Sequence, residues 1–571
     1  MNATARQAPE FADAPETSTR AADAILGANP FVGLEPNQML EQLTDFVSDT
    51  LKRPEILGGQ VVRLAVELAK IAAGVSDVTP ESSDKRFDDP AWTDNPVYRR
   101  VMQGYLAWRS AMQSMVSSNS EGDGDWKRAE QQRFAVRLLT EALAPTNTLL
   151  GNPAALKRAF ETGGASLVHG LRNFLDDLWN NNGMPQTVDK RPFAVGRNLG
   201  VTPGAVVFRS EVLELLQYTP ATRQVYERPL LLVPPQINKF YIMDLAPRRS
   251  LTEYAVGRGI PFFTVSWRNP KPVHRDWGLD QYVSALKEAL AAVCEIGDSE
   301  TANLLGVCSG GITSALLLGH LAALGDTRIN AATLVVTMLD SSMPSMTGMF
   351  TTAEGVAAAT ERSRREGVLN GADMARLFAW LRPNDLVWNY WVNNYLMGRD
   401  PAPFDILYWN ADSTNLPAAL HAGFLDLLLH NGLARAGAVR VLGSPIDLRA
   451  FNRDMMIVGG MTDHICTWRA VYSGARLFGG RLEFVLNSSG HVQTLVCPPT
   501  NFKARYYVGA TLRRDPDAWL KEAGEQKGSW WDHWLAWIEK RSGDKREAPA
   551  NLGSPRFPTL EAAPGRYVME Q

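Results

Sequence analysis

The stretch Leu304-Leu305-Gly306-Val307-Cys308-Ser309-Gly310-Gly311 contains a strand, a tight turn and the start of a helix. An apolar run ends at Val307, and a helical pattern of apolar residues begins at Ile312. Between them Cys308 stands in a Gly-x-Cys-x-Gly turn, the setting in which a nucleophile is presented on a sharp strand-to-helix bend. The glycines leave room for close packing of helix against strand, and a helix N-terminus helps to lower the pKa of a thiol. Cys308 is therefore a candidate nucleophile; the alternative is a buried structural cysteine.

Strand-like runs alternate with helical segments on both sides of this turn. The expected strands are residues 205–208, 212–217, 229–233, 261–267, 303–307, 331–339, 454–458 and 482–486. This alternation indicates a mainly parallel, doubly wound sheet, with the first two runs as an antiparallel hairpin at its edge. Together with the nucleophile turn, it predicts an α/β-hydrolase core over residues 196–571.

Three other regions differ from this core in amino-acid composition and in their pattern of apolar residues. Residues 1–25 contain few large apolar side chains and are expected to be a disordered tail. Residues 26–195 are expected to form an α-helical N-terminal domain, because apolar residues recur there at helical spacing. Residues 340–425 interrupt the alternation and are dense in Met, Trp and Tyr, which predicts an inserted cap. The alternative for these aromatic residues is that they form the segment's own core.

Two later loops supply the partners of a catalytic cysteine. Hydrolase-type triads run nucleophile, acid, histidine in chain order, with the acid and the histidine in loops after late strands. Asp463 follows the strand expected at residues 454–458, and His491 follows the one at 482–486. His464 is a competitor, but it directly follows Asp463, which makes it hard for that carboxylate to orient it. Asp340, after an earlier strand, is the second choice for the acid.

An oxyanion hole needs two backbone N–H donors. The N–H of Ser309, directly after the nucleophile, is expected to be one of them. The other should come from the loop Val233-Pro234-Pro235-Gln236-Ile237-Asn238. Because the prolines have no N–H, the donor must be Gln236 or Ile237, and we choose Ile237.

Composition excludes several classes of protein. The net charge is −3 and the chain has no long basic run, which argues against a nucleic-acid-binding protein. None of its four cysteines is in Cys-x-x-Cys spacing, so we expect no metal site and a reducing compartment. The N-terminus lacks the apolar core of a secretory signal, and no run approaches 18 apolar residues. We therefore expect a cytoplasmic protein with no transmembrane segment.

A cysteine nucleophile favours one class of substrate. Attack on a thioester is almost isoenergetic, because one thioester is exchanged for another. The acyl group stays activated on Cys308, and an alcohol can then take it downhill to an oxoester. A cysteine beneath an apolar cap therefore fits acyl transfer from a thioester to an alcohol, whereas access of water would give hydrolysis.

Several longer motifs support a more specific interpretation. They are DKRF at 84–87 with Pro90-Ala91-Trp92, Pro145-Thr146-Asn147, VPPQINKFY at 233–241, SWRNP at 266–270, GVCSGG at 306–311, RPND at 382–385, Tyr408-Trp409-Asn410, Thr462-Asp463-His464 and Ser489-Gly490-His491. From about Asp84 to the C-terminus the chain resembles the polyhydroxyalkanoate synthases. It looks most like the single-subunit class II, medium-chain-length branch, although Val307 departs from the usual GACSGG box.

The resemblance implies a function. Such an enzyme polymerises (R)-3-hydroxyacyl-CoA into polyester, releases CoA and passes through an acyl-cysteine. The catalytic residues of the family fall on Cys308, Asp463 and His491. The resemblance also implies a homodimer on the surface of polyester granules, and the CoA thioester is a substrate, so no cofactor is expected. The alternatives are a cysteine hydrolase of the thioesterase or dienelactone-hydrolase kind, and a granule-coating protein with an inactive fold.

Overall fold

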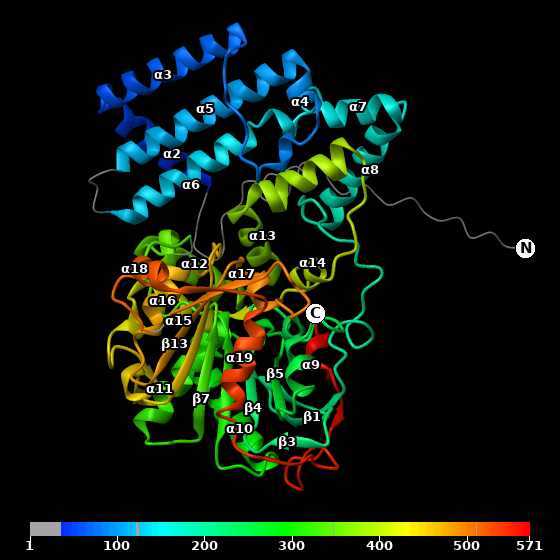
Figure 1. Cartoon of the computed structure of the whole chain (residues 1–571), viewed down its shortest axis with the longest axis vertical. Coiled ribbons are helices and arrows are strands. Elements are labelled where there is room, and N and C mark those ends of the chain that lie inside the picture. Colours follow the sequence, from blue (N-terminus) through cyan, green and yellow to red (C-terminus); the bar gives the residue numbers. More distant parts are fainter. Residues whose placement is uncertain (1–35, 121–124, 347, 510) are drawn as a thin grey trace, which may run out of the picture. The chain divides into compact units, whose positions relative to one another are not determined.

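The computed structural model describes residues 36–120, 125–346, 348–509 and 511–571, so the expected tail at residues 1–25 lies outside the described residues. The described residues divide into two compact units (Figure 1). The helical unit contains residues 36–189 and 376–402, and the sheet unit contains residues 190–375 and 403–571. The segment expected to be one inserted cap, residues 340–425, is thus shared between the two units.

Seven helices from the N-terminal part of the chain are described in the helical unit. They are α2 (Pro36–Leu51), α3 (Pro54–Ala73), α4 (Ala91–Asp94), α5 (Pro96–Ser120), α6 (Trp126–Ala142), α7 (Pro153–Glu161) and α8 (Ala165–Asn180). Short polar side chains cap the N-termini of two of them. Asp125 accepts hydrogen bonds from backbone N–H groups at the start of α6, and Asn152 accepts one at the start of α7.

Residues 376–402 belong to the helical unit although the residues before and after them belong to the sheet unit; we call them the returning segment. It contains the end of α13 (Gly371–Leu381) and the π-helical turns η6 (Asn384–Trp388) and η7 (Trp391–Leu396). The Trp391 indole donates to the carbonyl of Asn147 at 3.1 Å, and the Tyr395 hydroxyl donates to Asp177 at 2.8 Å. Phe174 of α8 makes edge contacts with both aromatic rings. These aromatic residues therefore complete the core of the helical unit.

The sheet unit is built on an 11-stranded sheet of order β15-β14-β13-β12-β7-β6-β4-β5-β2-β1-β17. The strands from β13 to β5 in this order are parallel, and the others are antiparallel. The strands are β1 (Gly204–Arg209), β2 (Leu213–Tyr218), β4 (Leu230–Val233), β5 (Phe262–Trp267), β6 (Ala302–Val307), β7 (Ile329–Val335), β12 (Asp454–Gly460), β13 (Leu482–Asn487), β14 (Arg505–Val508), β15 (Gly524–Lys527) and β17 (Glu561–Ala562). The predicted parallel core and the β1–β2 hairpin are confirmed.

Helices pack against this sheet, among them α10 (Leu279–Ile296), α11 (Cys308–Ala323) and α19 (Trp530–Glu539) (Figure 1). Along β6, Leu305 and Val307 join a core cluster that includes the buried tryptophans of α19. Gly306, between them, faces α11, because a Cβ atom there would lie 2.6 Å from Ser314 Oγ. Alternate residues of β6 thus contact different neighbours, as the two-residue period of a strand requires.

The structure corrects two details of the predicted sheet. The strand expected at residues 331–339 ends at Val335, because Val336 has φ 44°, a left-handed conformation that cannot continue a strand. Strands β14, β15 and β17 were not predicted; the first two are half-exposed or exposed and lack a long apolar run. Among the described helices, none combines the length and the apolar character that crossing a membrane would require.

Candidate active site

Cys308 occupies a strained turn between β6 and α11. Its φ is 50°, in the left-handed region that residues other than glycine rarely adopt. The turn is also tightly packed, because a Cβ atom on Gly310 would lie 2.2 Å from the carbonyl oxygen of Pro234. Such strain persists only where the surrounding structure enforces it, and it is typical of functional positions.

His491 and Asp463 lie together at the same edge of the sheet. Asp463 follows β12, and His491 begins the short helix α17 (His491–Leu495) after β13. Nδ1 of His491 is 2.6 Å from Oδ2 of Asp463, and the two residues are 7% and 5% exposed. The other carboxylate oxygen accepts the N–H groups of Ile465 at 2.8 Å and Cys466 at 2.9 Å. Asp463 is therefore held on both oxygens, and it fixes the orientation of the imidazole.

The electrostatics of this group favour an ion pair. A hydrogen bond from the Cys466 thiol and the positive charge of His491 hold the pKa of Cys308 well below its usual value, against the effect of burial. Burial lowers the pKa of His491, but the charges of Asp463 and Cys308 outweigh it, so that pKa lies well above its usual value. The interaction between the two side chains thus lowers the pKa of Cys308 and raises that of His491. A thiolate beside an imidazolium is the reactive state of a cysteine nucleophile.

The competing residues have other surroundings. Asp340 accepts hydrogen bonds from the Ser342 N–H and the Asn431 amide, both at 2.9 Å, and from the Ser473 hydroxyl. It thus ties the loop after β7 to its neighbours and is not bonded to a histidine. The histidine bonded to Asp463 is His491, as its place in the chain predicts, and not His464.

The expected oxyanion loop lies directly beside the nucleophile turn. The Gln236 N–H donates to Ser309 Oγ at 3.1 Å, so this N–H is already engaged. Ile237 is held through its carbonyl, which accepts the Thr414 N–H at 3.0 Å. Of the two possible donors, Ile237 therefore keeps its place as the candidate, with Ser309 as the other.

Two known families match successive parts of the chain. Residues 83–255 match the family described as the N-terminus of poly-beta-hydroxybutyrate polymerase (PhaC), and residues 243–496 match the alpha/beta hydrolase fold. Poly(3-hydroxyalkanoate) polymerase 1 of Ectopseudomonas oleovorans is 47% identical, with 97% of this chain and 99% of that protein covered. The chain belongs to the poly(3-hydroxyalkanoate) polymerase family. The predicted family, fold, synthase function and acyltransferase class are confirmed, and the hydrolase alternative is not favoured.

Other relatives are more distant. The polymerase subunit PhaC of Cupriavidus necator is 39% identical over 87% of this chain and 85% of its own length. Among solved structures, a monoacylglycerol lipase of Paleococcus ferrophilus is 14% identical with a TM-score of 0.31, covering 58% of this chain and 99% of that chain.

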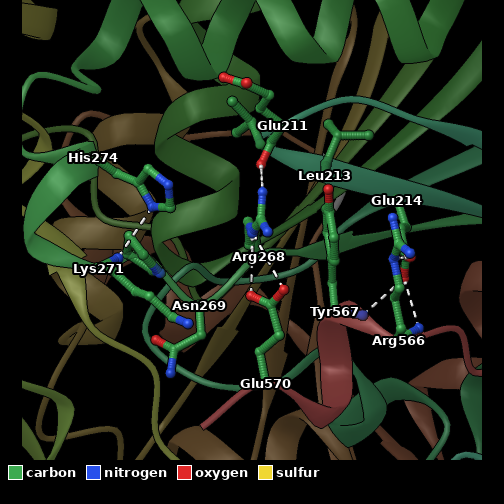
Figure 2. A network of polar contacts seen from close by, with 12 residues as sticks. Glu211, Leu213, Glu214, Arg268, Asn269, Lys271, His274, Arg566, Tyr567 and Glu570 are labelled. Carbon is green, nitrogen blue, oxygen red and sulfur yellow. Dashed lines mark hydrogen bonds and ion pairs between the residues drawn. The ribbon is translucent and has the colours of Figure 1, made fainter.

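The C-terminus of this polymerase-family chain lies against the loops that adjoin the oxyanion loop. The Arg268 guanidinium donates to both carboxylate oxygens of Glu570 at 3.2 Å, and on its other side it reaches the carbonyl of Glu211 at 3.5 Å (Figure 2). The Lys239 ammonium, on a residue only 3% exposed, donates to the backbone carbonyl of Glu570. The last residues of the chain therefore anchor the segment that carries Ile237, a role that the sequence did not suggest.

Sequence reasoning also missed Cys466. Its sulfur, a carboxylate oxygen of Asp463 and a ring nitrogen of His491 all lie within 4.8 Å of one another, a spacing at which three such ligands could hold a metal ion. In this chain the spacing is accounted for by the hydrogen bond between Asp463 and His491 and by the bond from the Cys466 N–H to Asp463. The available signal was local: an Asp side chain that accepts the N–H two and three residues later brings residue 466 back toward residue 463.

A cavity of about 1020 Å³ in the helical unit contains none of the candidate catalytic residues. Its lining mixes both signs of charge, including Arg86, Arg137, Asp84 and Glu141. Arg86 and Arg109 both pair with Asp84 at this site. This cavity therefore does not compete with the Cys308 site as the place of acyl transfer.

Proposed function

We propose that the chain polymerises (R)-3-hydroxyacyl groups from CoA thioesters into polyester, with Cys308 as the nucleophile and His491 and Asp463 as its partners. The observation that carries the proposal is the His491 ring, 2.6 Å from Asp463, in a chain of this family. The charge of Cys308, on the turn after β6, raises the pKa of that ring. A cysteine fits this chemistry because its acyl-enzyme is itself a thioester.

In the first half of the reaction, the Cys308 thiolate attacks the thioester carbonyl. The carbon–sulfur bond to CoA breaks, and the His491 imidazolium gives its proton to the leaving CoA thiolate. The N–H groups of Ser309 and Ile237 are the proposed donors to the oxygen that becomes negative, a contribution of the kind that accounts for much of catalysis in acyl transfer. The products are acyl-Cys308, free CoA and neutral His491.

In the second half, neutral His491 takes the proton of an incoming 3-hydroxyl group. The hydroxyl oxygen attacks acyl-Cys308, an oxoester forms, and Cys308 leaves as a thiolate beside the imidazolium. The starting ion pair is restored, so one histidine serves both halves. Asp463 stabilises the imidazolium in each, because its carboxylate is bonded to Nδ1.

The proposal includes no cofactor, since the energy for ester formation comes from the CoA thioester. It also includes a homodimer that works in the cytoplasm on the surface of the polyester granule, because the polyester product is insoluble and grows from the enzyme. Fractionation of expressing cells should find the protein with the granules, and light scattering with substrate should find the mass of two chains.

The deciding experiment measures three products from one incubation. Purified protein receives (R)-3-hydroxyacyl-CoA, and free CoA, free 3-hydroxy acid and insoluble polyester are quantified. Polymerisation predicts that polyester accounts for the CoA released. A yield of free acid equal to the CoA would instead establish a hydrolase, and no CoA release would establish an inactive coat protein.

A further inference from the structure

Thr414 holds two consecutive carbonyl groups of the loop beside the nucleophile turn. Its hydroxyl oxygen lies 2.5 Å from the carbonyl oxygen of Gln236, and its backbone N–H donates to the carbonyl of Ile237 at 3.0 Å. A carbonyl oxygen can only accept, so the hydroxyl is the donor in the first bond. Thr414 and Gln236 are each 2% exposed, so water has little access to this bond. One residue therefore fixes the backbone on both sides of the Ile237 nitrogen.

The bond to the Gln236 carbonyl also determines where the Ile237 N–H points. The two groups belong to one peptide unit, which is planar, and this unit is trans. In a trans unit the C=O and the N–H point in opposite directions. Because the carbonyl is held toward Thr414, the Ile237 N–H is directed to the opposite side of the loop.

Gln236 is fixed from the side of the nucleophile as well. Its N–H donates to Ser309 Oγ at 3.1 Å, and its side-chain amide donates to Thr313 Oγ1 at 2.8 Å, both on α11. A rotation of the Gln236 backbone would break these bonds or the bond to Thr414. The loop is therefore held between the start of α11 and the Thr414 hydroxyl.

Two backbone donors at this junction are left for a substrate. Among the residues that the structure describes, none accepts a hydrogen bond from the Ile237 N–H. The Ser309 N–H belongs to the first turn of α11, where the N–H groups have no partner within the helix. Donors that are fixed in place before the reaction are what an oxyanion hole requires.

We propose that Thr414 is a positioning residue for the oxyanion hole: by holding the Gln236 carbonyl, its hydroxyl directs the Ile237 N–H at the oxygen that becomes negative. The inference rests on the proposed function, with Cys308 as the nucleophile. A hydrogen bond accepted by the carbonyl also polarises the peptide unit, so the N–H becomes a stronger donor. The hole serves attack on the CoA thioester and attack of the hydroxyl on acyl-Cys308, so both halves of the reaction depend on Thr414.

The backbone of Thr414 is held independently of its hydroxyl. The N–H of the next residue, Asn415, donates to Asn269 Oδ1 at 2.9 Å, and the Asn415 amide donates to the Pro270 carbonyl at 3.1 Å. Asn415 Oδ1 accepts the Gly371 N–H at 2.9 Å. Thr414→Val, which keeps the shape of the side chain, should therefore remove the bond to the Gln236 carbonyl and leave this segment in place.

The first test compares the kinetics of CoA release. We expect Thr414→Val to lower kcat about tenfold with less than about a twofold change in KM, because a misdirected oxyanion donor acts on the transition state. Thr414→Ser keeps the hydroxyl and should stay close to wild type. The matched control is Thr140→Val, which removes a buried threonine hydroxyl that donates to the Arg137 carbonyl at 3.0 Å in the helical unit. It should have normal kinetics.

The second test uses two CoA derivatives to separate the oxyanion from ordinary substrate binding. In the first, the CoA sulfur carries a trifluoroacetonyl group. The Cys308 thiolate adds to its ketone carbon, a carbon–sulfur bond forms, the carbonyl electron pair moves onto oxygen, and no group leaves. In the second, a methylene replaces the ketone, so no oxyanion can form. We expect Thr414→Val to bind the ketone about tenfold more weakly and the methylene compound as tightly as wild type.

Equal affinity of wild type and Thr414→Val for the ketone would overturn the inference. An equal loss for both compounds would do so too, because it indicates a general disturbance of the site, and so would a Thr414→Ser variant as slow as Thr414→Val. If Thr414→Val does not fold, Thr414→Ala carries the same expectations. Failure of the proposed function is distinguishable: Cys308→Ala would then bind the ketone as tightly as wild type, which would refute the nucleophile and the hole together.

Discussion

Nδ1 of His491 lies 2.6 Å from Oδ2 of Asp463, and both side chains are almost fully buried. This single contact joins two loops that are 28 residues apart in the chain. It fixes the tautomer of neutral His491, because Nδ1 must carry the proton that the carboxylate accepts. In the proposed mechanism, the other ring nitrogen exchanges protons with Cys308 and with the incoming hydroxyl.

Replacing the two partners should separate the two halves of the reaction. His491→Ala should abolish acylation, because no group remains to protonate the leaving CoA or to stabilise the thiolate. Asp463→Asn should slow polymer formation at least about tenfold more than acylation, since a thiol ionises easily while an alcohol needs a strong base. Single-turnover acylation with labelled 3-hydroxyacyl-CoA, followed by polymer measurement, gives both rates.

In this experiment Asp463→Asn should accumulate labelled acyl-enzyme or short oligomers, and His491→Ala should accumulate neither. Asp340→Asn is the matched control, because that carboxylate is bonded to Ser342, Asn431 and Ser473 instead of a histidine. Equal acylation defects in the Asp463 and His491 variants would show that Asp463 only holds the histidine.

Substitution of the nucleophile should separate chemistry from folding. Cys308→Ala should release no CoA, and Cys308→Ser at most a trace, because a serine hydroxyl is less nucleophilic and its oxoester stores less energy for the next transfer. Circular dichroism and thermal unfolding should stay close to wild type. Near-normal CoA release by Cys308→Ala would refute the assignment of the nucleophile.

The C-terminal anchor should matter for turnover. Lys239→Met removes the donor to the Glu570 carbonyl while keeping an apolar side chain of similar length. We expect kcat to fall about tenfold with a smaller change in KM, because displacement of an oxyanion donor acts on the transition state. Lys271→Met, at an exposed lysine of a neighbouring loop, should have normal kinetics. If the two variants have equal kcat, the hydrogen bond between Lys239 and Glu570 does not contribute to catalysis.

Buried Asp244 should give the protein a stability that depends on pH. Burial raises the pKa of Asp244 to about 6, against hydrogen bonds from Thr202 and Ser250, while the ordinary value is 3.8. The folded state therefore binds the proton more tightly, and this stabilisation is complete below pH 3.8 and lost as the pH rises through about 6.

Thermal unfolding of wild type and Asp244→Asn between pH 3.5 and 8 measures this effect as a difference in midpoint. The wild type should lose stability relative to the variant from about pH 4 to pH 6 and show no further relative change above that range. A relative gain of stability by the wild type over the same interval would mean that the hydrogen bonds outweigh burial.

A pair of glycines tests the packing of the returning segment in the helical unit. A Cβ atom on Gly170 of α8 would lie 1.9 Å from the carbonyl oxygen of Tyr395. Gly170→Ala should therefore lower the free energy of unfolding by about 1–3 kcal/mol or more. Gly104→Ala in α5 meets only Leu68 at 4.0 Å and should stabilise by about 0.5–1 kcal/mol. Denaturant unfolding measures both, and similar effects would contradict this packing.

Much of the sheet unit follows from local patterns in the sequence. The strand that ends at Val307, the turn at Cys308 and the helix after it are encoded by an apolar run, flanking glycines and helical spacing within residues 302–323. Asp463 and His491 could be chosen because parallel strands end at one edge of a sheet, so loops after late strands converge there. The half-exposed β14 and exposed β15 lack such a signal, and they were missed.

Contacts between segments that are far apart in the chain could not be predicted from the sequence and became known only from the tertiary structure. Trp391 and Tyr395 lie in a segment whose aromatic content predicts a cap, yet both pack on Phe174 of α8. Which apolar surface an aromatic side chain covers depends on the surfaces that the rest of the fold leaves exposed. Likewise, nothing in the spacing of Lys239 and Glu570 predicts their hydrogen bond across 331 residues. The candidate reacting groups could be predicted from the sequence, since they depend on residue type and on where strands end. The position of the Cys466 sulfur within 4.8 Å of His491 required the fold, because a contact between two loops is a property of neither loop alone.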